Sequence, residues 1–416
     1  MFKLDGVDIP FEPGETLISA AAKKGIEIPH YCWHPGLSAP ANCRMCLVEI
    51  LPKPGMRPLM LDVLELDSKT GEYKPAQKPK LVPACRFPAA EGLEVKADTS
   101  PHVVQARKAV QESLLLNHPV DCPICDQSGE CKLQDYWLEH GKFSKRLRDE
   151  PVHKPKAVVF GPTMVYDAER CVLCTRCIRV MGEIAKDPVL GMRERGNLNE
   201  ISVAPGRQLD GHYTLMTEHV CPVGALTSQD FRFKARVWFL RTASSVCQGC
   251  ATGCNAHLDY DPRYNKAYRY RPRENHAVNK YWMCDEGMLS YRQAHEGRIT
   301  EARVNGKTST VPAALEAAAK LFEGGARASI AVVFSAQHSL EDNWALAELA
   351  KAFGTTLRFW SGKGDGDQDA ILRHADKNPN TAGVRGLVPE AKPLSALLEA
   401  VQSGTVHHVL ALGGVA

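Results

Sequence analysis

The sequence lacks several features that would assign it to a class at once. Neither charge sign is in excess, because 51 Lys and Arg against 48 Asp and Glu give a net charge of +3. Charge therefore offers no argument for binding nucleic acid or an anionic membrane surface. The apolar runs are short, and the opening Met-Phe-Lys-Leu-Asp-Gly has neither a basic start nor an apolar core. We expect a cytosolic protein with no signal peptide and no membrane span.

Cysteine is absent from residues 285–416 and abundant before them, where all 15 Cys lie. The composition, 44% apolar and 24% charged, is that of an ordinary globular protein, and the length predicts about two to four domains. In a reducing compartment an odd number of Cys indicates metal ligands rather than disulfides. Zinc and iron-sulfur sites normally take four protein ligands each, so the count is one ligand short of four sites.

The first Cys group consists of Cys32, Cys43, Cys46 and Cys85. Before it, the turn at Asp5-Gly6 and a helix capped by Thr16 predict a strand, strand, helix opening. Between Cys46 and the fourth Cys lies a Pro-rich and Lys-rich excursion, 52–83. The C-x10-C-x2-C spacing with a distant fourth Cys matches the plant-type [2Fe-2S] layout with a longer first loop. A zinc ribbon needs two close Cys pairs, so [2Fe-2S] is favoured over zinc.

The second group supplies the missing ligand. A helix predicted from Ser100 to Asn117 ends at a histidine, and an H-x3-C-x2-C-x5-C run follows, formed by His118, Cys122, Cys125 and Cys131. A zinc site with three Cys and one His is the alternative on ligand type alone. The neighbouring iron-sulfur-like groups favour [4Fe-4S], in which a neutral imidazole makes the site less anionic and acts to raise its reduction potential.

The third group is a C-x2-C-x2-C loop with a distal Cys-Pro, formed by Cys171, Cys174, Cys177 and Cys221. This is the pattern of a two-cluster ferredoxin. The positions where the second cluster would need Cys hold Met181, Gly211, Thr214 and Thr217 instead. The pattern therefore predicts a single [4Fe-4S] cluster.

The fourth group has the spacing C-x2-C-x3-C-x29-C and consists of Cys247, Cys250, Cys254 and Cys284. The spacing alone leaves zinc and iron-sulfur open.

Several of these runs resemble one known family. They are Asn42-Cys-Arg-Met-Cys-Leu-Val-Glu49, Asn117-His-Pro119, Asp121-Cys-Pro123, Gly129-Glu-Cys-Lys-Leu-Gln-Asp135 and Trp282-Met-Cys-Asp-Glu-Gly287. Together with the order of the four groups, they are similar to the large iron-sulfur subunit, the G subunit, of bacterial NADH-quinone oxidoreductase, respiratory complex I. The resemblance covers roughly residues 1–300, and it assigns a [4Fe-4S] cluster to the fourth group, whose four Cys are all in place.

The resemblance implies an α+β multidomain chain. Its parts are a β-grasp [2Fe-2S] ferredoxin domain (1–98), a [4Fe-4S] segment with one His and three Cys ligands (99–140), a ferredoxin-like [4Fe-4S] domain (141–236), the [4Fe-4S] start of a molybdopterin-oxidoreductase-like domain (237–296) and a truncated α/β region of that domain (297–416). Because members of the family continue for hundreds of residues, we expect this chain to lack most of the last domain or to be a fragment.

The implied function is electron relay from a flavin subunit toward quinone, in a complex that couples the reaction to proton translocation. The expected cofactors are one [2Fe-2S] and three [4Fe-4S] clusters, without molybdopterin. The expected partners are the flavin and NADH-binding subunit and other iron-sulfur subunits of the peripheral arm, with no nucleic acid. We expect no catalytic residue and no NADH, flavin or quinone site in this chain, and a peripheral place on the cytoplasmic side of the inner (plasma) membrane.

The last part of the sequence predicts α/β alternation. An Asn305-Gly306 hairpin is followed by a helix at 313–321, a strand at 329–334, a helix at 340–353 and strands at 355–360 and 408–412. Gly362, Gly364 and Gly366 follow a strand, but the neighbouring aspartates would repel phosphate, so we expect a flexible loop there rather than a phosphate site.

Three other functions are weighed against the relay. A molybdenum or tungsten formate dehydrogenase needs a metal-ligating Cys or selenocysteine after the fourth group, and residues 285–416 have none. The diaphorase subunit of a soluble hydrogenase normally stops before a fourth group. A zinc-stapled scaffold is disfavoured by the plant-type spacing and the Cys-Pro signature.

Overall fold

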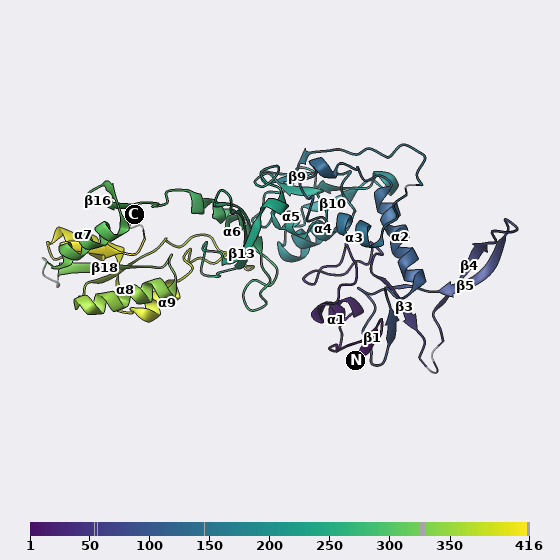
Figure 1. Ribbon diagram of the computed structural model, residues 1–416, viewed down its shortest axis with the longest axis horizontal. Coiled ribbons are helices and arrows are strands. Elements are labelled where there is room, and N and C mark those ends of the chain that lie inside the picture. The colour runs from purple at the N-terminus through teal and green to yellow at the C-terminus, as the bar shows by residue number, and fades with distance from the viewer. Residues whose placement is uncertain (54, 56, 145, 324–328, 414–416) are drawn as a thin grey trace. The chain divides into compact units, whose positions relative to one another are not determined.

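A computed structural model describes the chain except residues 54, 56, 145, 324–328 and 414–416. The chain forms two compact units, Met1–Phe239 and Leu240–Ala416 (Figure 1). The first three ligand groups lie in the first unit and the fourth lies in the second. None of the described helices has the length and apolarity needed to cross a membrane.

The first unit opens with a five-stranded sheet of order β2-β1-β7-β3-β6. Its strands are β1 (Phe2–Leu4), β2 (Val7–Ile9), β3 (Leu47–Leu51), β6 (Val82–Pro83) and β7 (Glu94–Lys96). The predicted hairpin turn is confirmed, since Asp5 and Gly6 have φ of 48° and 87°. Helix α1 (Leu17–Lys23) begins at Thr16, whose side chain accepts a hydrogen bond from the backbone N–H of Ser19 and so forms the predicted cap.

Side chains of this sheet and of α1 form the first apolar core, in which Ile9, Leu17, Val48 and Val95 are fully buried. Two predicted ligands of the first group, Cys46 and Cys85, belong to the same core. The core therefore fixes the backbone that carries them.

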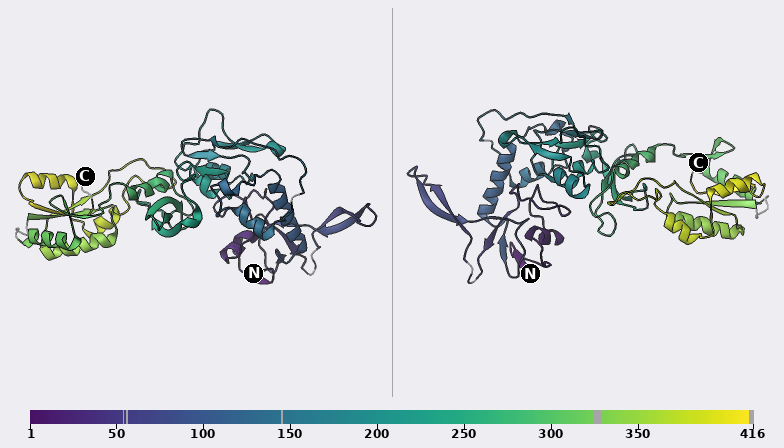
Figure 2. Two further views of the ribbon diagram at one scale, coloured as in Figure 1. Left: turned by 45° about the horizontal axis from the view of Figure 1, so that its top comes forward. Right: turned by 180° about the vertical axis from the view of Figure 1, so that it is seen from behind.

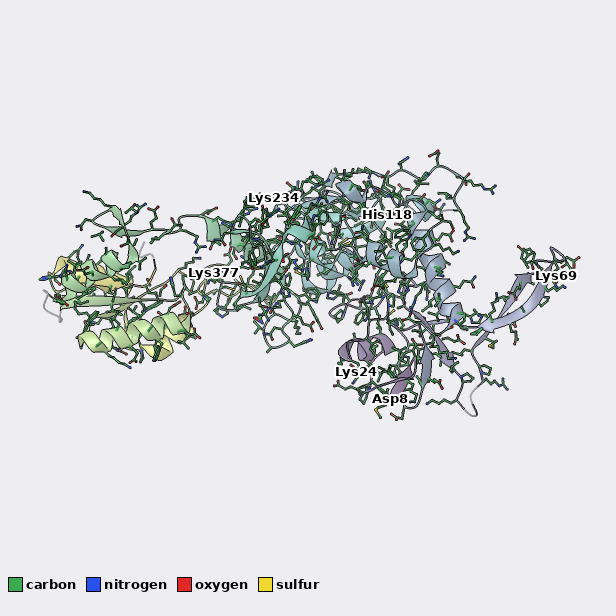
Figure 3. All side chains as sticks on the ribbon, viewed as in Figure 1. Asp8, Lys24, Lys69, His118, Lys234 and Lys377 are labelled. Carbon is green, nitrogen blue, oxygen red and sulfur yellow. The ribbon has the colours of Figure 1, made fainter. Side chains whose placement is uncertain are left out.

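A two-stranded ribbon occupies the Pro-rich and Lys-rich excursion. Strands β4 (Met60–Leu66) and β5 (Tyr73–Pro79) pair antiparallel, and Lys69 lies near the tip (Figure 3). The sequence pattern did not predict this ribbon, because proline inside a strand argues against strand formation.

The rest of the first unit carries the second and third groups on short elements. Helix α2 (Pro101–Leu115) is capped by Ser100 as predicted, and it ends two residues before Asn117. The other elements are η1 (Cys122–Ile124), α3 (Lys132–His140), β8 (Val158–Val159), β9 (Met164–Tyr166), α4 (Arg176–Arg179), η2 (Val180–Ile184), β10 (Leu190–Arg193), η3 (Gly196–Leu198), β11 (Glu200–Val203), α5 (Met216–Val220), β12 (Leu226–Ser228) and η4 (Val237–Phe239).

The second unit begins with an antiparallel sheet of order β13-β14-β15. Its elements are β13 (Arg241–Val246), β14 (Asn255–Asp261) and β15 (Lys266–Pro272), followed by α6 (Asp285–Leu289) and η5 (Ser290–His295). Asp259 is only 2% exposed and pairs with Arg269 at 2.7 Å and Arg271 at 2.6 Å. Burial acts to raise the pKa of Asp259, but hydrogen bonds and charges from Arg271 and Arg269 outweigh burial and bring this pKa to about 2.

The α/β alternation predicted for the last part is confirmed. The hairpin strands are β16 (Ala302–Val304) and β17 (Lys307–Ser309). The elements that follow are α7 (Val311–Glu323), β18 (Ile330–Ser335), α8 (Leu340–Phe353), β19 (Arg358–Ser361), α9 (Thr381–Leu387), β20 (Lys392–Pro393), α10 (Leu394–Gln402) and β21 (His408–Ala411). The four strands β18 to β21 form one parallel sheet of order β20-β19-β18-β21.

Helices cover both faces of this parallel sheet (Figure 2). On one face, Phe334 contacts residues of α8 and α9, and on the other, Phe359 contacts Leu397 of α10. All six residues of β18 are buried, as expected for the central strand of a sheet covered on both faces. The sequence pattern did not predict α9 and α10.

Candidate metal centres

The first group converges in the core of the five-stranded sheet. Cys32, Cys46 and Cys85 are at most 1% exposed. The backbone N–H of Ala84 donates to the carbonyl of Cys46 at 2.9 Å, which draws the distant fourth Cys to the loop that carries the other three. Hydrogen bonding to Cys43 and Cys85 lowers the pKa of the Cys32 thiol, and the hydrogen bond to Cys32 raises that of Cys85. Hydrogen bonds thus link the four thiols, between Cys32 and both Cys43 and Cys85, and between Cys46 and Cys85.

The second group lines a cavity of about 370 Å³, which all four predicted ligands border. Burial lowers the pKa of His118 to about 4, so its imidazole is neutral at pH 7 and can act as a metal ligand. The Nδ1 atom of His118 is buried and has no hydrogen-bond partner among the described residues. An ion pair of Arg170 and Asp121, 2.6 Å apart, holds the loop that precedes Cys122. The space and the donors of this site fit a cluster.

The four Cys of the third group lie close together and border a small cavity of about 10 Å³. Leu173 and Thr175, with φ of 51° and 61°, turn the loop back on itself, and the N–H of Leu173 donates to the sulfur of Cys171 at 3.4 Å. Inward-pointing N–H groups of this kind stabilise anionic sulfur.

Burial raises the pKa of the thiols in the third group, to about 11 for Cys171, Cys174 and Cys221. Thiolates at this site therefore need nearby cations, and metal binding has to release protons. The hydroxyl of Tyr166 donates to the sulfur of Cys171 and accepts from the N–H of Ile201 at 3.1 Å.

A buried arginine links the first and third groups. Arg179 is 9% exposed and donates from Nη2 to the carbonyls of Cys32 and Cys174, the latter at 3.2 Å. Its Nη1 donates to the carbonyl of Ser38. One cation therefore lies against the backbone of a ligand from each group.

The fourth group lies in the hairpin loop between β13 and β14 and at the start of α6. The N–H of Cys247 donates to the carbonyl of Cys254 at 2.8 Å. Asn279 is 1% exposed; it accepts from the N–H of Asn255 at 3.0 Å and donates to the carbonyl of Trp282 at 3.0 Å. This side chain brings the distal Cys of the group to the hairpin.

The four Cys of the fourth group border a cavity of about 230 Å³. A Cβ at Gly287 would lie 3.1 Å from the sulfur of Cys247 and 3.4 Å from that of Cys284, so a side chain there would crowd two ligands. The structure brings together all four predicted groups. In the described part of the chain, no three His, Cys, Asp or Glu side chains are placed to hold one single metal ion.

Family models match the chain in four successive stretches. They are a 2Fe-2S iron-sulfur cluster binding domain (1–100), an NADH-ubiquinone oxidoreductase-G iron-sulfur binding region (107–146), an NADH-quinone oxidoreductase subunit 3 ferredoxin-like domain (161–227) and a molybdopterin oxidoreductase Fe4S4 domain (240–296). Each stretch contains one complete ligand group.

Curated relatives, each named as the G subunit of NADH-quinone oxidoreductase, match most of the chain. The protein of Streptomyces coelicolor is 33% identical over 84% of this chain, that of Rickettsia bellii 36% over 73%, and that of Mycobacterium tuberculosis 31% over 84%. Over most of its length the chain is therefore similar to the G subunits of NADH-quinone oxidoreductase. It spans 39% of the length of the first relative and 41% of the length of the other two.

Among solved structures, the crystal structure of an NAD+-reducing [NiFe]-hydrogenase in the H2-reduced state matches 57% of this chain and 90% of its own chain. The two are 28% identical, with a TM-score of 0.45.

Several residues shape the candidate sites without belonging to the predicted ligand sets, and the sequence pattern did not reveal them. A Cβ at Gly224 would lie 2.4 Å from the sulfur of Cys125, although Gly224 follows a Cys of the third group and Cys125 belongs to the second. Arg179 contacts the backbone of Cys32, which is distant in sequence. Tyr166 contacts the nearby Cys171, and Asn279 bonds to Asn255, which follows Cys254. No spacing rule connects these residues to a ligand, so only the fold reveals them.

Proposed function

We propose that the chain carries one [2Fe-2S] and three [4Fe-4S] clusters and relays electrons within an NADH-quinone oxidoreductase complex. The observation that carries the proposal is the agreement between two divisions of the chain. The four stretches matched by family models contain one complete four-ligand group each, and these groups use all 15 Cys and one His.

The proposed ligands are those that the Cys and His spacing predicts. Cys32, Cys43, Cys46 and Cys85 hold the [2Fe-2S] cluster. The three [4Fe-4S] clusters are held by His118, Cys122, Cys125 and Cys131, by Cys171, Cys174, Cys177 and Cys221, and by Cys247, Cys250, Cys254 and Cys284. When bound, such clusters take up and release single electrons.

The protein's own part is to hold, shield and tune these sites. Burial shields eight of the 15 thiols from water, and backbone N–H groups donate to sulfur, as those of Leu173 and Gly249 do at 3.4 Å. The neutral His118 imidazole reduces the negative charge of the second site. The proposal places no NADH, flavin, quinone or molybdopterin site in this chain.

The relay requires partner subunits. A flavin and NADH-binding subunit has to deliver electrons, and further iron-sulfur subunits of the peripheral arm have to pass them toward quinone while the whole complex translocates protons. We place the chain peripherally on the cytoplasmic side of the plasma membrane. We also propose the five-part division at 98, 140, 236 and 296, with a β-grasp first domain and a molybdopterin-oxidoreductase-like last part.

The test is to purify the complex through an affinity tag on this chain and assay three reactions. NADH-dependent quinone reduction is expected, and it should be abolished by Cys177→Ala but not by Met192→Ala, a change at a residue that is 52% exposed on β10. Formate-dependent or H2-dependent reduction of NAD+ in place of NADH-quinone activity would contradict the proposal in favour of a formate dehydrogenase or a hydrogenase.

A further inference from the structure

The cavity of the fourth group has a wall that lies outside the stretch matched by the Fe4S4 family model, which ends at residue 296. Asp367, Leu372, Arg373 and Lys377 border the cavity together with the four Cys. We infer that residues 362–378, between β19 and α9, form a cover that retains the fourth cluster and shields it from water. The inference rests on the proposed function, because it presupposes a cluster at this site.

Three contacts attach the 362–378 segment to the ligand loops. The N–H of Ala251 donates to the carbonyl of Asp376 at 2.9 Å, and the hydroxyl of Thr252 donates to the carbonyl of Leu372. Both donors lie between Cys250 and Cys254. The third contact is an ion pair of Arg373 Nε with Glu286 Oε2 at 2.9 Å, two residues after Cys284. The segment therefore joins the two separate parts of the ligand set.

The segment is itself held in shape by a buried asparagine (Figure 3 labels its neighbour Lys377). Asn378 is 2% exposed; its Oδ1 accepts from the N–H of Lys363 at 2.7 Å and its Nδ2 donates to the carbonyl of Lys363 at 2.8 Å. Across the loop, the N–H of Gly366 donates to the carbonyl of Ala375 at 2.9 Å. The residues for which we expected a flexible loop are thus tied together by hydrogen bonds.

Close packing also explains two of the three glycines. A Cβ at Gly362 would lie 2.8 Å from Oδ1 of Asn378, and a Cβ at Gly366 would lie 2.7 Å from Cε of Lys377. Side chains at these positions would push away the residues that close the loop. Gly362 and Gly366 therefore allow the cover to pack closely.

The ion pair of Arg373 and Glu286 is the contact that substitutions can test most directly. The side chain of Arg373 is 10% exposed and that of Glu286 is 54% exposed, so the pair is partly shielded from solvent. Reversing either charge puts like charges together between the cover and the helix that follows Cys284. Without this attachment, we expect the cover to open faster and the fourth cluster to be lost at a higher rate.

The experiment follows anaerobic iron loss from the fully loaded chain to a ferrous chelator, with EPR spectra to identify which cluster disappears. Arg373→Glu and Glu286→Arg are each expected to speed loss of the fourth cluster about tenfold, and the double variant with the charges exchanged is expected to return to within about twofold of the wild-type rate. The other three clusters should keep their wild-type rates.

The matched control is Lys351→Glu, which breaks an exposed pair with Glu348 on α8, 2.6 Å apart in the same unit; it should leave all four rates unchanged. Arg373→Gln is a milder second variant in case charge reversal prevents folding, and it should also speed loss of the fourth cluster. If Arg373→Gln loses the fourth cluster at the wild-type rate, the inference that residues 362–378 cover this cluster is wrong. A wild-type fourth site that contains no iron would instead overturn the proposed function.

Discussion

Replacing Gly224 by alanine should remove one cluster and spare three. The new Cβ would lie 2.4 Å from the sulfur of Cys125 and 2.9 Å from Cβ of Gln127, whereas ordinary contact begins at 3.4 Å. The sulfur would have to retreat by about 1 Å, and metal-ligand distances tolerate deviations of about 0.2 Å. The φ of Gly224 is not positive, so the alanine backbone is unstrained and the effect is purely steric.

The expected result is loss of the second cluster, with the iron content falling from about 14 to about 10 per chain. Overpacking of this kind costs about 1–3 kcal/mol, which the folded first unit should survive. The assay is iron and sulfide analysis with EPR spectra of the reduced chain. The control is Gly191→Ala on β10, where a Cβ meets nothing within 4 Å. A Gly224→Ala chain that keeps all four clusters would refute the steric argument.

Three further predictions concern a ligand, a tuning residue and stability. His118→Ala should also lower the iron content by about four per chain with the other clusters intact; unchanged iron would show that His118 is no ligand. Tyr166→Phe removes the hydroxyl that donates to Cys171 and should lower the midpoint potential of the third cluster alone, measured by EPR redox titration, because hydrogen bonds to sulfur favour the reduced form; an unshifted potential would contradict this role. Asp259→Asn should destabilise the second unit by about 2 kcal/mol at pH 7, since the pKa of Asp259 falls from 3.8 to about 2 on folding. A lowered pKa stabilises the fold above about pH 4, so the difference from wild type in urea unfolding should shrink as the pH falls from 4 toward 2; a difference that stays constant over this range would contradict the assignment.

Much of the local fold follows from short-range signals in the sequence. The Asp5-Gly6 turn, the Thr16 cap and the Ser100 cap each act within a few residues, and the structure confirms all three. The apolar residues of β18 lie between two segments whose sequence pattern predicts helices, so the parallel sheet could be predicted. The β4–β5 ribbon was not, because its prolines oppose strand propensity, and helix α9 was missed in a segment with two glycines.

Which Cys and His side chains lie together could be predicted, because Cys spacing reflects the chemistry of such a site directly. The surroundings of the sites were not, because they are assembled from distant segments. Gly224 contacts a ligand of another group, and Arg179 contacts the backbone of two groups at once. The cover at 362–378 lies more than 70 residues beyond Cys284 in the chain, and no local pattern links it to that ligand.

Anaerobic metal and sulfide analysis of the purified chain tests the central claim most directly. One two-iron and three four-iron clusters predict about 14 Fe and about 14 sulfides per chain, with no molybdenum and no zinc. Stoichiometric zinc, or molybdenum near one per chain, would contradict the account.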